Sequence, residues 1–148
     1  MKIAINGHGA SIVIAIIGSE NPSSENPSDA NWLTCSVAID IGGFAANYPA
    51  AFTTSDFARF RCEIKTALAA MNGTASFITD ESALQFTAEI GRTGTVIIKG
   101  QGQVFGHTRA TLSFSFESDQ TFFAETIRCL DAVVRQYPVI EQRLPGQQ

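Results

Sequence analysis

Apolar and polar residues alternate with a repeat of two along much of this chain. The clearest cases are residues 32–41, 84–90 and 110–116, where every second residue is apolar. Because successive side chains of a strand point to opposite faces, these segments predict half-buried strands. Runs rich in β-branched residues predict the remaining strands, at residues 2–6, 10–17, 74–79 and 95–100, the last of which can extend to Val104.

Two other segments place apolar residues three and four positions apart, which is the spacing of one face of an α-helix. The first helix is expected to begin at a cap on Thr54 or Ser55 and to end at the Asn-Gly pair of residues 72–73. The second is expected to begin at Ser118 or Asp119. The apolar stripes consist of Phe57, Phe60, Ile64, Leu68 and Met71 in the first helix and of Phe123, Ile127, Leu130, Val134 and Tyr137 in the second.

Gly7, His8 and Gly9 raise the question of a cofactor site, because a strand followed by a glycine turn opens the dinucleotide-binding folds. Such a fold needs a helix directly after the glycines, so that the helix N-terminus meets the pyrophosphate, and a third glycine at position 12. Position 12 is isoleucine, and the residues that follow predict a strand. The sequence therefore predicts a hairpin turn here and no cofactor.

Residues 20–31 form a long segment without an apolar pattern, ENPSSENPSDAN. Its two Asn-Pro pairs and its serines oppose a helix or a central strand, so a loop is predicted. Long loops in compact domains are often binding surfaces or mobile segments. This loop contains Glu20, Glu25 and Asp29.

The predicted elements follow the order strands, helix, strands, helix. Short turns between the strands indicate antiparallel pairing, and each helix has one apolar stripe to bury. The sequence therefore predicts an α+β fold in which two α-helices pack on one face of a twisted antiparallel β-sheet. We expect a single domain over residues 1–148, with its core in residues 1–138, a polar C-terminal tail over 139–148 and no internal repeat.

The net charge of −4 is unevenly distributed. Residues 1–58 hold five acidic residues and one basic residue, whereas residues 59–148 hold nine of each. The negative net charge argues against nucleic acid as a partner, because contacts with phosphates require basic residues. An acidic surface can instead face a basic protein and speed their encounter, although a solvated surface explains the same charges.

The residues that carry enzyme chemistry are few and scattered. Cys35, Cys62 and Cys129 are odd in number and far apart, so buried reduced thiols are expected rather than disulfides or a zinc site. His8 and His107 adjoin glycines in predicted turns, where exposed side chains are expected. No nucleophile, phosphate-binding loop or acid-base pair has a recognisable spacing. The sequence therefore gives no support for an enzyme, a metal site or a cofactor.

The apolar run at residues 12–17 is too short to span a bilayer, which takes about 18 apolar residues or more. A lysine precedes it, as in a signal peptide, but Gly-His-Gly interrupts the segment and no clear small-residue cleavage site follows. Together with the unpaired cysteines, this pattern favours a reducing, cytoplasmic location without membrane contact.

Three short motifs point to a family. D-A-N-W-L begins at Asp29, F-E-S-D-Q-T-F-F spans residues 116–123 after the Phe-rich helix, and Q-Y-P closes the second helix at residues 136–138. In this order they resemble the bacterial WapI-type immunity proteins, over about residues 29–138. The resemblance implies a non-enzymatic cytoplasmic protein that neutralises the C-terminal domain of a polymorphic or contact-dependent toxin, which is often a nuclease.

Under this hypothesis the toxin-facing surface combines the acidic loop with the adjoining strand, because the basic cleft of a nuclease would attract carboxylates. The alternative is a structural subunit or a small-ligand-binding module, with Phe86, Phe114 and Phe116 around a pocket. Weak self-association is compatible with either. The candidate toxin-binding residues are Glu20, Glu25, Asp29, Trp32 and Asp40.

Overall fold

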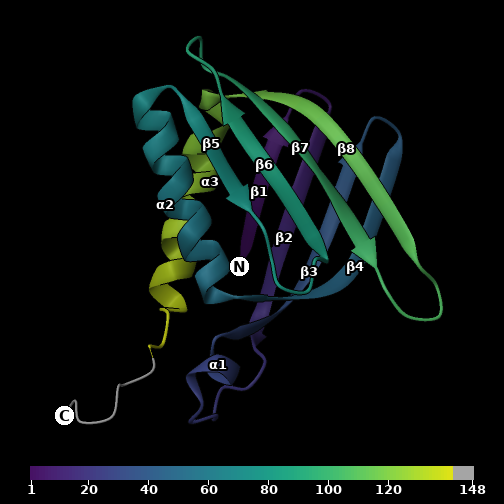
Figure 1. The fold of residues 1–148 in the computed structure, drawn as a ribbon, viewed down its shortest axis with the longest axis vertical. Coiled ribbons are helices and arrows are strands. Elements are labelled where there is room, and N and C mark those ends of the chain that lie inside the picture. The colour runs from purple at the N-terminus through teal and green to yellow at the C-terminus, as the bar shows by residue number, and fades with distance from the viewer. Residues whose placement is uncertain (142–148) are drawn as a thin grey trace.

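The structure, a computed structural model, describes residues 1–141 (Figure 1). Within these residues the strands form two antiparallel sheets, sheet A with the order β1-β2-β3-β4 and sheet B with the order β5-β6-β7-β8. The elements in chain order are β1 (Lys2–Gly7), β2 (Ala10–Ser19), α1 (Pro27–Ala30), β3 (Trp32–Ile41), β4 (Phe44–Thr53), α2 (Thr54–Ala70), β5 (Gly73–Phe77), β6 (Leu84–Ile90), β7 (Thr95–Val104), β8 (Ala110–Asp119) and α3 (Gln120–Gln136).

The α+β class is confirmed, but the strands form two sheets rather than the single sheet expected. The division falls at α2, which separates β4 from β5, so these two strands do not pair. Each sheet is a meander of four strands followed directly by a helix of 17 residues. The chain thus repeats one architectural unit, although no repeat is visible in its sequence.

Helices α2 and α3 lie side by side along one side of the two sheets (Figure 1). α2 lies against β5 and α3 against β1, so each helix borders a different sheet. Arg61 Nε of α2 lies 2.5 Å from Asp131 Oδ1 of α3, and Lys65 Nζ lies 3.8 Å from the same oxygen. The hydrogen bond from Arg61 lowers the pKa of the Asp131 carboxyl, which holds this link in its charged form.

Two segments differ from the sequence-based expectation. Residues 44–53 form β4, which no alternation predicted because alanines and Pro49 obscure its pattern. β4 is an edge strand, where proline is tolerated. The loop at residues 20–31 contains α1, a single helical turn that begins because the Asn26 side chain accepts a hydrogen bond from the Ser28 N–H and Pro27 supplies a helical φ.

The helix ends follow the expected chemistry with small shifts. Asp119 caps α3, as predicted. α2 is capped by Thr53, one residue earlier than expected, because Thr53 and Asp56 form a capping box in which each side chain accepts from the other residue's backbone N–H. The left-handed residue that ends α2 is Met71, with φ of 52°, and it precedes the Asn-Gly pair that was expected to end this helix.

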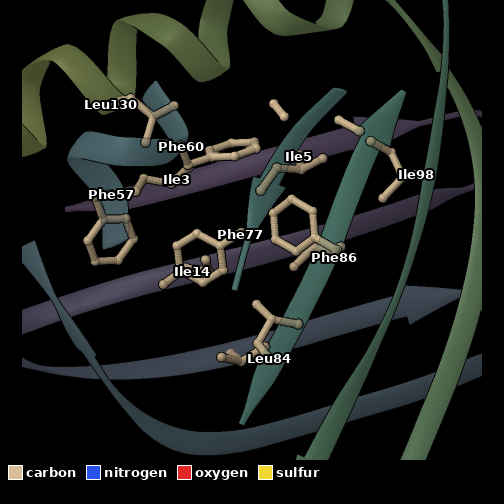
Figure 2. Packing of buried hydrophobic residues seen from close by; sticks show 14 of the residues in the cluster. Ile3, Ile5, Ile14, Phe57, Phe60, Phe77, Leu84, Phe86, Ile98 and Leu130 are labelled. Carbon is tan, nitrogen blue, oxygen red and sulfur yellow. The ribbon is translucent and has the colours of Figure 1, made fainter. Parts of the chain in front are cut away.

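The core lies between the inner faces of the two sheets, beneath the two long helices (Figure 2). Phe57 and Phe60 of α2 contact Phe77 of β5, whose ring stacks on Phe86 of β6 with centroids 5.4 Å apart. The edge-on contact of Phe60 with Phe77 and the stacked contact of Phe77 with Phe86 are favourable geometries for aromatic rings. The aromatic residues that the ligand-binding alternative placed around a pocket are buried in this core: Phe86, Phe114 and Phe116.

The free edge of β1 is closed by hydroxyl groups from the second half of the chain. Thr126 Oγ1 of α3 donates to Ala4 O at 2.7 Å, and Ser118 Oγ of β8 donates to Asn6 O at 2.6 Å. An uncovered edge strand exposes backbone groups that invite pairing with another chain. These two bonds satisfy carbonyls on that edge and tie sheet A to both α3 and sheet B.

Gly7 lies where β8 meets the end of β1. The His8 N–H donates to Glu117 O at 2.9 Å, and a Cβ on residue 7 would lie 2.5 Å from that oxygen and 2.6 Å from a ring carbon of Phe116. The predicted hairpin is confirmed, with His8 and Gly9 as the two residues between β1 and β2. Gly7 therefore allows the two sheets to approach each other.

We expect Gly7→Ala to lower the free energy of unfolding by about 1–3 kcal/mol, the usual range for overpacking a filled site. The measurement is urea denaturation followed by circular dichroism. Gly18→Ala in β2 is the matched control, because a Cβ there meets nothing within 4 Å. Equal stability of the two variants would contradict the tight junction at Gly7.

Candidate partner-binding surface

Four of the candidate toxin-binding residues lie together at one end of sheet A. Glu20 follows β2, and its backbone N–H donates to Trp32 O at 2.9 Å. Asp29 lies in α1, and Glu25 lies in the loop that leads to α1. The three carboxylates are exposed and Trp32 is half-buried. In Figure 1 the segment that contains α1 projects below the sheet.

Asn31 holds the acidic loop in place. Its side-chain amide forms two hydrogen bonds with the backbone of Ile140, Nδ2 to the carbonyl at 3.0 Å and Oδ1 from the N–H at 2.9 Å. Its backbone oxygen accepts from the Thr54 N–H at 2.9 Å, and Thr54 Oγ1 donates to Asn31 Oδ1 at 3.2 Å. Asn31 thus fastens α1 both to the start of α2 and to the chain that follows α3.

Asp40 is separated from the other four candidates. It lies eight residues beyond Trp32 in β3, which is about 26 Å along a strand. Trp32 and Asp40 nevertheless point to the same outer face, because the residues that alternate with them, from Leu33 to Ile39, are buried. The candidates therefore mark the two ends of one sheet face rather than a single acidic patch.

Asp56, the fifth acidic residue of the N-terminal segment, has a structural role. It is buried, accepts the Thr53 N–H at 2.9 Å in the capping box, and lies 3.2 Å from Arg59 Nη2. Its carboxylate therefore serves the start of α2 and does not add to a partner-binding surface.

The histidines and carboxylates do not assemble a metal site in residues 1–141, where no group of three potential ligands converges. Both histidines are exposed in turns, as expected. His8 Nε2 lies 3.6 Å from Asp119 Oδ2, and the imidazole meets the Phe122 ring edge-on. Hydrogen bonds from Thr121, with a smaller effect of His8, lower the pKa of the Asp119 carboxyl. Asp119 is the N-cap of α3, so its charged carboxylate stabilises the start of that helix.

The three thiols occupy different environments, which corrects the expectation that all are buried. Cys35 lies in the core, where burial raises the pKa of its thiol to about 12. Cys129 is half-buried, and partial burial beside Glu125 raises the pKa of its thiol. Cys62 is exposed because it lies off the apolar stripe of α2. The thiols are free and belong to different elements.

A model of the Immunity protein WapI-like family matches residues 2–138, a range that includes every strand and helix from β1 to α3. The chain belongs to the WapI-like immunity protein family. Comparison with curated proteins and with solved structures finds no match. Membership confirms the resemblance suggested by the motifs, and it indicates an immunity function for this WapI-like chain.

Within residues 1–141 of this WapI-like chain, no helix combines the length and apolar character that crossing a bilayer requires. The C-terminal tail predicted from residue 139 onward falls mostly on residues 142–148, which lie outside the described residues. Its first part is exposed but fixed, because Ile140 bonds to Asn31.

An open cleft next to β4 could not be expected from the sequence, because β4 itself was not predicted. Residues 44–48 of β4, 102–104 of β7 and 110–112 of β8 line a cleft of about 310 Å³. Phe44 at its rim is 70% exposed. None of Phe86, Phe114 and Phe116 lines this cleft, so it is distinct from the pocket that the ligand-binding alternative placed among those residues.

We expect the thiols to react in the order Cys62, Cys129, Cys35. With a pKa of about 12, Cys35 is ionised in about one molecule in ten thousand at pH 8, and only the thiolate attacks disulfide reagents. Titration of the native protein with such a reagent, followed by peptide mapping, measures the order. Labelling of Cys35 as fast as Cys62 would contradict the packed core.

We expect Asn31→Ala to destabilise the protein by about 1–3 kcal/mol, because it removes three side-chain hydrogen bonds. It should also expose the loop at residues 20–31 to faster proteolysis. Limited proteolysis with mass spectrometry measures this effect. Asn21→Ala is the control, because in the described part of the chain the exposed Asn21 side chain makes no hydrogen bond. Equal cleavage would show that Asn31 does not hold the loop.

Proposed function

We propose that this chain protects its cell by binding the C-terminal domain of a cognate toxin and blocking it without covalent chemistry. The observation that carries the proposal is the family match over residues 2–138. Immunity of this kind requires tight and selective binding rather than turnover, so the chain acts by forming a complex in the cytoplasm and not as an enzyme.

The acidic loop supports a basic partner. Glu20, Glu25 and Asp29 are exposed, and Asn31 fastens their segment to the body of the protein. A surface that is already ordered loses less conformational entropy when it binds, and this raises affinity. A toxin that cleaves nucleic acid has a basic substrate cleft, which such carboxylates would attract and cover.

The five candidate residues have separate roles in this proposal. The three loop carboxylates steer the toxin domain toward this end of sheet A, and Trp32 beside them supplies an amphipathic aromatic contact of the kind enriched in interfaces. Asp40 provides a second acidic contact at the far end of β3.

We expect the triple variant Glu20→Lys, Glu25→Lys, Asp29→Lys to associate with the toxin domain about 10-fold more slowly at low ionic strength, because steering by opposite charges is reversed. The partner in this experiment is an inactive form of the cognate C-terminal toxin domain. Surface plasmon resonance at several salt concentrations measures the association rate, and the difference should shrink as salt rises.

The control variant is Asp80→Lys, Glu81→Lys, Glu89→Lys, which changes the net charge equally at exposed positions in and beside sheet B. This control variant should associate with the toxin domain at a rate close to that of the wild type. If the two triple variants associate equally slowly, net charge rather than the acidic loop governs the encounter. If the wild type does not bind the toxin domain, the proposed function is wrong.

A further inference from the structure

The outer face of sheet A is nearly free of charge. The residues of β1–β4 that point away from the core are all exposed or half-buried, so no described element covers this face. Of these outward residues, all within the described part of the chain, only Lys2 and Asp40 carry a charge, and both lie at the margins. The centre consists of Val13, Ala15, Ser36, Ala38, Asn47 and Pro49.

Sheet B provides an internal comparison, because it repeats the same meander of four strands. Its outer face carries charge at the centre: Lys99 lies between Thr87 and Ser115 in the register of the strands. In the next row Glu89 and Glu117 flank Ile97. Charged and polar side chains of this kind are usual on a solvated sheet face. The architecture therefore does not require an uncharged outer face, and sheet A differs for another reason.

The size of the face suits a protein partner. Three strands of ten residues, each about 30 Å long, and the shorter β1, all spaced about 4.8 Å apart, present roughly 500 Å². With the adjoining loop this approaches the roughly 800 Å² that each partner contributes to a standard interface. Interface centres are likewise depleted of charged residues, and Trp32 at one end of this face supplies an aromatic side chain of the kind that interfaces enrich.

Resting on the proposed function, we propose that the outer face of sheet A is the surface on which the toxin domain docks, through a flat apolar surface with basic residues at both ends. The carboxylates at the two ends of the face indicate which kind of partner binds there. Glu20, Glu25 and Asp29 lie beyond Trp32 at one end, and Asp40 lies at the other. Opposite charges at those two places fix the orientation of the partner.

The same charges disfavour a second copy of this chain. Two copies stacked through this face by a two-fold axis would bring either the two acidic loops together or each loop against the Asp40 end of the other copy. Each arrangement sets carboxylates against carboxylates, which costs binding free energy. A partner with basic ends avoids this repulsion.

The test is Ala38→Glu, which places a carboxylate at the centre of the face, in an exposed position opposite Val13 and Asn47. Burial of this charge against an apolar partner should weaken binding of the inactive toxin domain by about 10- to 100-fold, mainly through faster dissociation. Asn47→Glu tests the centre of the same face on edge strand β4, which tolerates charge. Thermal denaturation of each variant shows whether it is folded.

The matched control is Thr87→Glu, the same charge change at an outward position of β6, an inner strand of sheet B. It should dissociate from the toxin domain at the wild-type rate. If Ala38→Glu and Asn47→Glu are folded and bind like the wild type, the docking face is wrong while the proposed function stands. If the wild type itself fails to bind, the proposed function fails. Sedimentation that shows a wild-type dimer disrupted by Ala38→Glu would assign the face to a second copy instead.

Discussion

The closure of the β1 edge is the constraint on which the arrangement of this protein depends. Thr126 of α3 and Ser118 of β8 donate hydroxyl hydrogen bonds to carbonyls of β1, and Gly7 permits the backbone contact between His8 and Glu117. Two meanders that pair no strands with each other are thereby joined into one core. The helices and sheet B occupy the inner side and the β1 edge of sheet A, and its outer face is left uncovered.

This arrangement suits a protein whose task is to bind. A packed core of interlocking Phe rings holds the sheet in one shape, so a partner meets a preformed surface and little ordering entropy opposes binding. The acidic loop, which would be mobile by itself, is fixed by the Asn31 amide to segments far away in the chain. The charges at the ends of the face then govern the association rate of the partner, and the uncharged centre governs its dissociation rate.

The sequence predicts most elements because local periodicity determines them, but it does not reveal what the chain brings together. Alternation identified β3, β6 and β8. The alanines of β4 obscured that strand, and without β4 the sequence did not show that sheet A ends there and that the strands form two sheets. The acidic residues were recognisable, yet the distance between Asp40 and the loop depends on the length and direction of β3. The role of Asn31 rests on a contact with Ile140 that no local pattern encodes.

The most direct test of the account is a crystal structure of this chain with an inactive form of its cognate toxin domain. The account predicts that the toxin domain covers Trp32 and Ala38 on the outer face of sheet A, with basic side chains near the loop carboxylates and near Asp40. Lys99 on the opposite sheet should remain in solvent. A complex in which the toxin domain contacts the outer face of sheet B or the two long helices, and leaves Ala38 exposed, would contradict it.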